Sequence, residues 1–495
     1  GDSEHHHFVP SGMTTLTHRR KNITLATVFT VAGVLYCLIS LVNHYLFKTY
    51  ALDLGLYTHA MYDYTHFRID DCGMFKMQPQ SILSDHFDLY LVLLSPLIFV
   101  FGSYTLLIVQ IVAVLLGGWG VYKLIGLYTE NAWLPVLVSA TFFFSFGIIH
   151  PLAFDYHSNV VSAMMLPWLL YYLKKRQFKW ASFLFVFIAI GKENMSLWLL
   201  FVAVALMWDY RKDKQALWHL VAYAVFAVVY FFVINMIVMP KLGGNGSGFA
   251  RYAHLGSNYA EIFRNLVSHP WQTVEILFSN TSGFERNNGI KAEFYICALA
   301  TGMVFTVLKP NYLIMLIPLI AQKMLAADGT VWGISYQYSV EFMPILVVSA
   351  FLVFSRIEKQ LWQLVLAVVL LLSTVLTTFY TIGVPKSEVK LDQLCVYQKR
   401  HYEQKNFDVH YAYEVIEMIP EGASVTAITP FVPHLAMRDT IRSFGYIRRV
   451  DTEYVLMTKP YFEYERDGVL VLNNRDEYET VATDGTIYLL KRKAP

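Results

Sequence analysis

Charged residues are scarce in this chain. Only 15% of its 495 residues are charged, whereas 56% are hydrophobic, and the mean hydropathy is +0.42. A soluble globular chain usually carries roughly 25% charged residues. The composition therefore excludes an ordinary water-soluble protein and indicates one that lies in a membrane.

Excess positive charge is also missing. The formal net charge is only +2, so no reserve of basic residues exists to neutralise nucleic-acid phosphates. No internal repeat is visible, and the inverted-repeat symmetry common in secondary transporters is not expected. The sequence therefore disfavours a nucleic-acid-binding protein and gives little support to a transporter.

Cysteine is rare as well, and its spacing carries no motif. The four cysteines are far apart and form no CxxC pair, which excludes a zinc ribbon and a dense disulfide framework. A bond between Cys72 and Cys395 stays open only if both face an oxidising compartment. Residues 1–12, GDSEHHHFVPSG, are interpreted as an expression remnant, so His5, His6 and His7 are not taken as a metal site.

Long apolar runs are abundant. Residues 23–46 are too long for the core of a signal peptide and are followed by no small-residue cleavage site, which predicts a retained membrane-spanning helix. Arg19, Arg20 and Lys21 precede it and place the N-terminus in the cytoplasm. Further apolar segments cover residues 104–127, 133–149, 160–173, 217–239, 294–308, 312–325, 342–354 and 361–381.

Basic clusters orient these segments. The cluster Lys174, Lys175, Arg176 and Lys179 and the cluster Arg211, Lys212 and Lys214 are both expected on the cytoplasmic side. Residues 180–208 must then cross the membrane an even number of times, yet they are too short for two full spans of its hydrocarbon core, which is roughly 30 Å thick. We expect a hairpin of two short helices with its tip at residues 191–194, buried part-way from the outer face.

The predicted fold is mainly α, a polytopic membrane protein with about eleven transmembrane helices. Amphipathic residues 57–64 and 259–266 and the apolar residues 87–101 predict helices at the outer membrane interface. After residue 384 the composition changes, and the strand-length runs ASVTAI, EYVLM, GVLVL and TIYLL predict a small soluble α/β domain. The predicted domains are residues 13–384 in the membrane and 385–495 outside it.

Four groups of ionisable residues fall at the outer face, where their burial needs a reason. Asp53 follows the first span, and its simplest role would be to cap the next helix. Asp85 and His86 directly precede the interfacial helix expected at residues 87–101. Asp155 and His157 lie on a short loop, either as satisfied polar groups or as a site for a metal ion or a phosphate-bound water.

The tip of the hairpin carries the fourth group. Lys192 and Glu193 could pair with each other, or Lys192 could meet a phosphate while Glu193 holds it in position. A further helical face presents His59, Asp63 and His66 at spacings that suit a metal ion. Spacing of this kind is often coincidental.

The segments LDLGLYTHAMY, SDHFDLYLVLLSPL, FDYHSNVVSAMMLPWLLYYL, GKENMSLWLL, SYQYSVEFMPIL and IPEGASVTAITPFVPHLAMR resemble, in order and spacing, a family of bacterial and archaeal membrane proteins of unassigned function. That family is similar to the GT-C glycosyltransferases, which are integral membrane enzymes that use lipid-linked sugars. The resemblance covers residues 52–438.

The resemblance implies roles for particular residues. It makes Asp53, in the first outer loop, the catalytic acidic residue. It makes Asp155, His157, Asp85 and His86 metal ligands or residues that orient such ligands, and it allows a divalent cation, Mg²⁺ or Mn²⁺. The K-E-D pattern departs at Asn194, and a usual histidine is Gln337 here. The donor phosphate is then assigned to Lys192, Glu193, Tyr336 and Gln337.

On this basis the chain is expected to be an inverting glycosyltransferase of the bacterial inner membrane. The expected donor is a polyprenyl-phosphate sugar, and the expected acceptor is a glycan, lipid or protein on the periplasmic side, where the C-terminal domain also lies. Asp53 would deprotonate the acceptor hydroxyl. The alternatives are a non-enzymatic carrier or scaffold for polyprenyl phosphate and, more remotely, a proton-coupled transporter.

Overall fold

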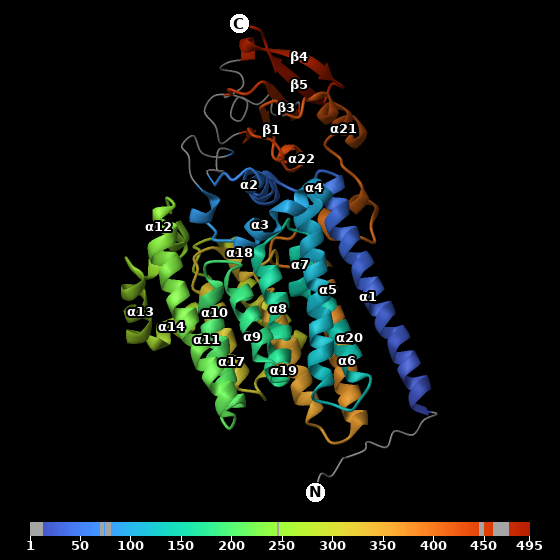
Figure 1. Ribbon diagram of the computed structural model, residues 1–495, viewed down its shortest axis with the longest axis vertical. Helices are drawn as coiled ribbons and strands as arrows, with labels where there is room; N and C mark the ends of the chain where they lie inside the picture. The colour runs from blue at the N-terminus through green and yellow to red at the C-terminus, as the bar shows by residue number, and fades with distance from the viewer. Residues whose placement is uncertain are drawn as a thin grey trace.

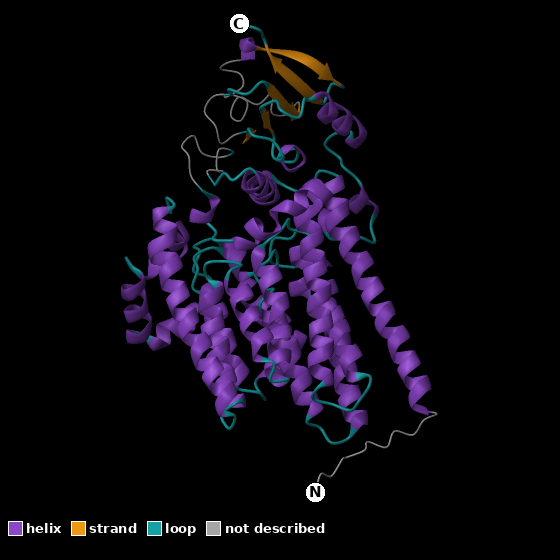
Figure 2. Ribbon diagram, in the orientation of Figure 1, coloured by secondary structure: helices purple, strands orange, loops and turns teal. Residues whose placement is uncertain are grey.

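The computed structural model describes residues 13–69, 74, 81–244, 247–383, 385–444, 450–458 and 475–495. A bundle of helices makes up most of the molecule, and a small sheet lies at one end of it (Figures 1 and 2). Three features of the sequence fall outside the described residues: the segment 1–12, Cys72 and the expected strand GVLVL. Cys395, the other cysteine considered for a disulfide, is buried.

Long apolar helices build the bundle. Among the described residues, four helical stretches are long and apolar enough to cross a membrane, and a fifth is added if two helices bent by 44° form one broken span. The long stretches are Thr15–Tyr45, Leu89–Gly126, Lys214–Lys241 and Gln360–Gly383, and the bent pair is Leu134–Phe143 with Phe146–Leu152. The chain is therefore a polytopic helical protein of membrane type.

The expected number of about eleven transmembrane helices, two of them the short helices of the hairpin, is not confirmed in the described part of the chain. Several expected spans are shorter helices, because polar residues, prolines or glycines interrupt them. Residues 294–308, for example, are divided around Gly302, whose φ of 126° no ordinary helix adopts. The helices before residue 240 are α1 (Met13–Tyr45), α2 (Leu56–Thr65), α3 (Leu89–Leu94), α4 (Ile98–Phe101), α5 (Thr105–Gly126), α6 (Leu134–Phe143), α7 (Phe146–Leu152), α8 (Ser158–Lys174), α9 (Phe178–Ala189), α10 (Met195–Asp209), α11 (Lys214–Val233) and α12 (Met239–Lys241).

The later helices are α13 (Tyr259–Ser268), α14 (Pro270–Ile276), α15 (Ile290–Ala298), α16 (Val304–Thr306), α17 (Asn311–Met324), α18 (Gly329–Trp332), α19 (Phe342–Ser355), α20 (Gln360–Gly383), α21 (Val409–Met418) and α22 (Val432–Leu435). Two of the expected interfacial helices are α2 and α13. Figure 1 views α2 nearly end-on, so it runs across the direction of the bundle helices, between them and the sheet. The third, residues 87–101, is divided into α3 and α4, which continue toward α5.

The predicted hairpin is present as α9 and α10. The two basic clusters at its base lie side by side, since Arg176 pairs with Asp213 and donates a hydrogen bond of 2.7 Å to Gln215. Both clusters therefore lie on one side of the bundle, as an even number of crossings requires. At the tip, a side chain on Gly191 would meet Ser162 at 2.1 Å and Tyr90 at 2.6 Å, so only glycine lets the turn pack this closely.

The C-terminal region forms a five-stranded sheet in the order β2-β1-β3-β5-β4. Strands β1 (Val425–Ala427), β2 (Ile441–Ser443) and β3 (Tyr454–Thr458) are parallel. Strand β5 (Ile487–Arg492) pairs antiparallel with β3, and β4 (Tyr478–Thr483) pairs antiparallel with β5. Strands β1, β3 and β5 fall on three of the predicted runs. Strands β2 and β4 were not expected, because β2 is short and β4 has a mostly exposed, polar face.

The sheet region packs directly on the outer end of the bundle. The imidazole of His434 stacks on that of His44 at 4.0 Å, and its Nε2 lies 2.8 Å from the His44 carbonyl oxygen. Lys48, which follows α1, donates to the carbonyl oxygens of Asp392, Arg400 and His401 at 2.9 to 3.2 Å. These contacts fix the C-terminal region against the loop that carries Asp53.

Candidate functional site

Asp53 lies in a single π-helical turn, Ala51–Gly55, that leads directly into α2. It does not cap a helix: the cap positions of the two helical segments are Tyr50 and Gly55, and neither makes a side-chain cap. Gly55 is itself helical, so the chain enters α2 without the free N–H groups that a cap would satisfy. The Asp53 side chain is 18% exposed and instead faces His157, with 3.6 Å between its Oδ2 and Nε2 of the imidazole.

Asp155 supports this turn from the opposite loop. Its Oδ2 accepts hydrogen bonds of 3.1 Å from the backbone N–H groups of Tyr50 and Leu54, on either side of Asp53. The backbone of Asp155 is in the left-handed region, with φ of 51°, a conformation that costs energy and recurs at functional sites. The loop thus brings Asp53, Asp155 and His157 together, as the resemblance implied.

The two carboxyl groups have different proton affinities. Burial raises the pKa of Asp155 to about 7, and the Asp53 carboxylate adds to the rise, although the two N–H donors oppose it. For Asp53 burial would also raise the pKa, but His157, His86 and Lys192 outweigh it and hold that pKa below its ordinary value. Asp53 is therefore ionised at neutral pH, while Asp155 titrates there.

Gln110 is a functional-site residue that the sequence analysis missed. It lies fully buried in α5, where its Nε2 donates to the Asp155 carbonyl oxygen at 3.0 Å and its Oε1 accepts from the His157 N–H at 3.1 Å. One amide thereby holds both residues of the loop. The available signal was a lone glutamine inside the apolar run TLLIVQIVAVLL.

Glu193 pairs with His86. The distance from Nδ1 of His86 to Oε1 of Glu193 is 3.2 Å, and the other oxygen accepts the N–H of Phe87 at 3.1 Å. Burial would raise the pKa of Glu193, but His86 and nearby Lys192 lower it to about 2. Asp85 lies at the edge of this pair, half-exposed, 3.8 Å from His86. The suggested pairing of Lys192 with Glu193 is thus replaced by a pairing of Glu193 with His86.

Lys192 lines a cavity of about 500 Å³, open space at its mouth included. Gln337 and Arg251 line the same cavity. Arg251 was missed, because no arginine was assigned to the donor phosphate from the sequence, yet Arg251 lines this cavity. Tyr336 lies instead on a neighbouring pocket of about 220 Å³, beside Phe154 and Lys390.

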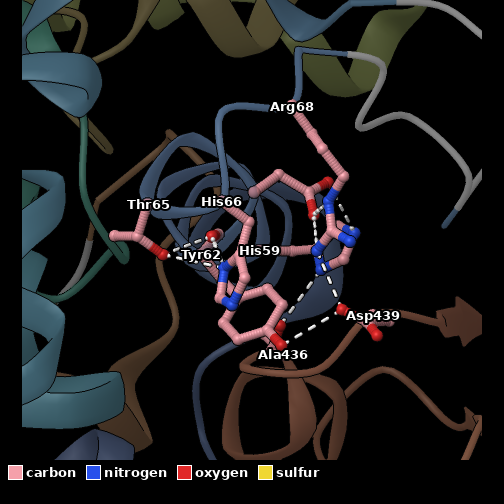
Figure 3. A network of polar contacts seen from close by, with 8 residues as sticks. His59, Tyr62, Thr65, His66, Arg68, Ala436 and Asp439 are labelled. Atoms are coloured by element: carbon pink, nitrogen blue, oxygen red, sulfur yellow. Dashed lines mark hydrogen bonds and ion pairs between the residues drawn. The ribbon is translucent and has the colours of Figure 1, made fainter.

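The third candidate metal site lies on α2, where His59 and Asp63 belong to an interface with the sheet region. His59 Nε2 lies 3.3 Å from Asp63 and its Nδ1 lies 3.1 Å from the Ala436 carbonyl oxygen. Arg68 joins Asp63 to Asp439 at 3.0 and 2.8 Å, and Figure 3 shows it reaching Asp439 from the far side of α2. These contacts tie α2 to the sheet region.

His66 takes no part in that interface or in any metal site. Its Nδ1 lies 2.9 Å from the Tyr62 carbonyl oxygen of its own helix, as Figure 3 also shows. Across the described ranges, no group of three or more His, Cys, Asp or Glu side chains could hold a metal ion. Oδ2 of Asp155 accepts two backbone N–H groups, and the divalent cation stays an expectation from the sequence.

Three solved structures resemble the whole chain at TM-scores below 0.5. They are ArnT from Cupriavidus metallidurans bound to undecaprenyl phosphate (TM-score 0.46, 12% identity, 98% of this chain and 99% of that one), the Archaeoglobus fulgidus oligosaccharyltransferase tethered to an acceptor peptide (0.44, 11%, 95% and 74%) and the arabinofuranosyltransferase AftD from Mycobacteria (0.42, 12%, 95% and 41%). No curated protein matches the sequence.

A family profile shows to which family the chain belongs. The profile described as Predicted membrane protein (DUF2079) matches residues 43–479, which is most of the chain and includes every residue of the Asp53 cluster and of the Lys192 cavity. The family expected from the ordered sequence segments is thereby confirmed, and the chain belongs to the predicted membrane proteins of the DUF2079 family.

Proposed function

We propose that the chain is an inverting membrane glycosyltransferase that takes a sugar from a polyprenyl-phosphate donor and transfers it to an acceptor hydroxyl at the periplasmic face. One observation carries the proposal: an ionised Asp53 lies beside His157 and Asp155 at the end of the bundle where Lys192 and Arg251 line a cavity. A base and a cationic pocket are the two elements that this transfer requires.

The proposed step is a single displacement at the anomeric carbon. Asp53 accepts the proton of the acceptor hydroxyl, the acceptor oxygen forms its bond to the anomeric carbon, and the bond from that carbon to the phosphate oxygen breaks. The polyprenyl phosphate leaves with the electron pair. Lys192 and Arg251 stabilise its charge, and Gln337 lines the same cavity.

The remaining assigned residues hold this geometry. His157 faces the Asp53 carboxylate, and Asp155 fixes the turn through the N–H groups of Tyr50 and Leu54. Glu193 and His86 order the tip next to Lys192. Tyr336 lies on the adjacent pocket and would contact the donor only from there. The described residues do not form a metal site of their own, and no step of the proposal uses a cation.

The proposed location is the bacterial inner membrane, with a cytoplasmic N-terminus and the sheet domain in the periplasm. Two arrangements support this orientation. The basic clusters meet through Arg176 and Asp213, and α1 ends at the sheet after beginning at the opposite end of the bundle (Figure 1).

The test is Asp53→Asn in the full chain, reconstituted with polyprenyl-phosphate sugars that carry a hexose or a pentose. We expect release of polyprenyl phosphate to be abolished while insertion and the thermal midpoint are unchanged. Glu414→Gln, an exposed carboxylate on α21, is the matched control and should stay active. Full activity of Asp53→Asn would exclude the assigned base. A wild-type protein that binds the lipid phosphate but never releases a sugar would instead be a carrier.

A further inference from the structure

Three buried amide oxygens without hydrogen-bond partners in the described part of the chain belong to residues that line one cavity. They are Oδ1 of Asn159, Oδ1 of Asn194 and Oε1 of Gln337, and the cavity is the one that Lys192 and Arg251 also line. A buried acceptor without a donor is destabilising, and native proteins rarely tolerate one without a cause. Three around one cavity indicate that the cavity receives a ligand rich in donors.

The orientation of Asn159 is fixed by its neighbours. Its Nδ2 donates to the carbonyl oxygen of Gln337 at 3.2 Å and to Oε1 of Glu341 at 2.9 Å. Turning the amide over would place its oxygen against two acceptors. The unpartnered end is therefore the oxygen, as the contacts require.

The cavity also excludes certain ligands. Glu341 lines it and is buried, so a second carboxylate beside the amide oxygens would meet this acid. Three cations line the cavity as well. The ammonium of Lys323 already donates to the carbonyl oxygens of Val331 and Gly333, and Lys192 and Arg251 are the residues assigned to the phosphate. Tyr338 and Phe342 line it as well and supply apolar surface. The lining therefore suits a neutral ring that bears several hydroxyl groups.

We propose that this cavity is the sugar subsite of the donor, specific for a neutral hydroxylated monosaccharide. Hydroxyl groups of the ring donate to the amide oxygens of Asn159, Asn194 and Gln337. The phosphate lies toward Lys192 and Arg251. In this arrangement Gln337 recognises the sugar rather than the phosphate. The inference rests on the proposed function, and it adds the class of sugar and the residues that select it.

The experiment compares the affinity of two lipids, polyprenyl phosphate and a polyprenyl-phosphate hexose, for the full-length protein in detergent. We expect the wild type to bind the hexose-bearing lipid more tightly. Asn194→Ala and Gln337→Met each remove one acceptor and should reduce that preference by about 5- to 10-fold, without altering the affinity for polyprenyl phosphate. Lys192→Met should weaken both lipids equally.

A uronic-acid version of the donor should bind no better than polyprenyl phosphate. Asn194 is only partly buried, so Asn194→Ala keeps the test usable if Gln337→Met fails to fold. Two results would overturn the subsite and leave ordered water as the partner of these oxygens. One is an unchanged preference in a folded Asn194→Ala protein, and the other is a uronic-acid lipid that binds as tightly as the hexose lipid. A wild type that shows the sugar preference but transfers nothing would refute the transferase and keep the subsite.

Discussion

Nε2 of His157 lies 3.6 Å from Oδ2 of Asp53, although helices α2 to α7 separate the two residues in the sequence. Its other ring nitrogen, Nδ1, is buried without a partner among the described residues. The imidazole is therefore positioned by packing, with Phe154 stacked on it at 4.9 Å, and its polar contact is directed to Asp53. The relationship makes the charge of Asp53 depend on His157.

Replacing His157 should therefore shift the pH dependence of transfer. Burial favours protonation of Asp53, and His157 is the largest of the groups that oppose it and lower its pKa. His157→Asn removes that opposition, so the pKa of Asp53 rises and less of it is ionised at a given acidic pH. We expect the acidic limb of the kcat/KM profile to move to higher pH.

The control for this shift is His410→Gln, on an exposed imidazole of α21. It should leave the profile unchanged. A His157→Asn enzyme that loses rate equally at every pH would show that the imidazole acts on the acceptor or the donor and not on Asp53.

Gln110 gives a prediction on stability. Gln110→Leu leaves the Asp155 carbonyl oxygen and the His157 N–H buried without partners, and each such group costs about 1–3 kcal/mol. We expect a clear drop in the thermal midpoint in detergent, together with a loss of transfer. Gln360→Leu, at the exposed start of α20, is the matched control. A normal midpoint in Gln110→Leu would mean that the loop keeps its shape without the amide.

Much of this architecture was predictable from the sequence. The apolar segments, the hairpin 180–208 and three strands of the sheet follow from local patterns, and the same patterns singled out Asp53, Asp155 and His157. The number of spans does not follow in this way, because hydropathy measures the composition of a segment and not the bends at Gly302 or between α6 and α7.

The contacts between segments were not predictable in the same way. The sequence allowed Asp53 to cap the helix that follows it. The structure excludes this role, because the π-helical turn runs directly into α2 and leaves no free helix end there. Arg251 and Lys192 are far apart in the sequence, and they meet at one cavity that residues of α17 also line. A single sequence records which groups are costly to bury but not which partners offset that cost.

Asp155 should make stability depend on pH. Its pKa is raised from 3.8 to about 7 by burial, so between these values the folded protein keeps a proton that the unfolded chain has lost. The free energy of unfolding then falls as pH rises through this window. Asp155→Asn removes the titrating group and keeps an oxygen for the two N–H donors. We expect the difference in thermal midpoint between about pH 5 and about pH 8 to shrink in this variant.

Asp88 contributes to the pH dependence in the same window. Its pKa is also raised to about 7 by burial, while it accepts hydrogen bonds from Tyr90 and Tyr156. The Asp155→Asn protein should therefore keep part of the wild-type difference, and the double variant with Asp88→Asn should keep less of it. An Asp155→Asn midpoint that still falls with pH as steeply as in the wild type would show that Asp155 is ionised in the folded state.

The sheet region should affect the rate of sugar transfer, because one of its hydroxyl groups holds the turn that carries Asp53. Thr429, just after β1, accepts the N–H of Ala51 at 2.9 Å, and Ala51 begins the turn that carries Asp53. Thr429→Val keeps the shape of the side chain but leaves that N–H without its acceptor, a change worth about 1–3 kcal/mol. Because the turn can relax locally, we expect a small change in thermal midpoint but a decrease of about tenfold or more in the rate of transfer, since small misplacements of a base are costly.

Thr440→Val, before β2 in the same sheet, is the matched control and should retain the wild-type rate. Single-turnover measurements with saturating donor separate the chemical step from binding. If Thr429→Val raises KM and leaves the single-turnover rate intact, the sheet region serves binding of the acceptor and not the position of Asp53. If the rate alone falls, the C-terminal region is part of the catalytic unit, because the base is held in place from both the bundle and the sheet.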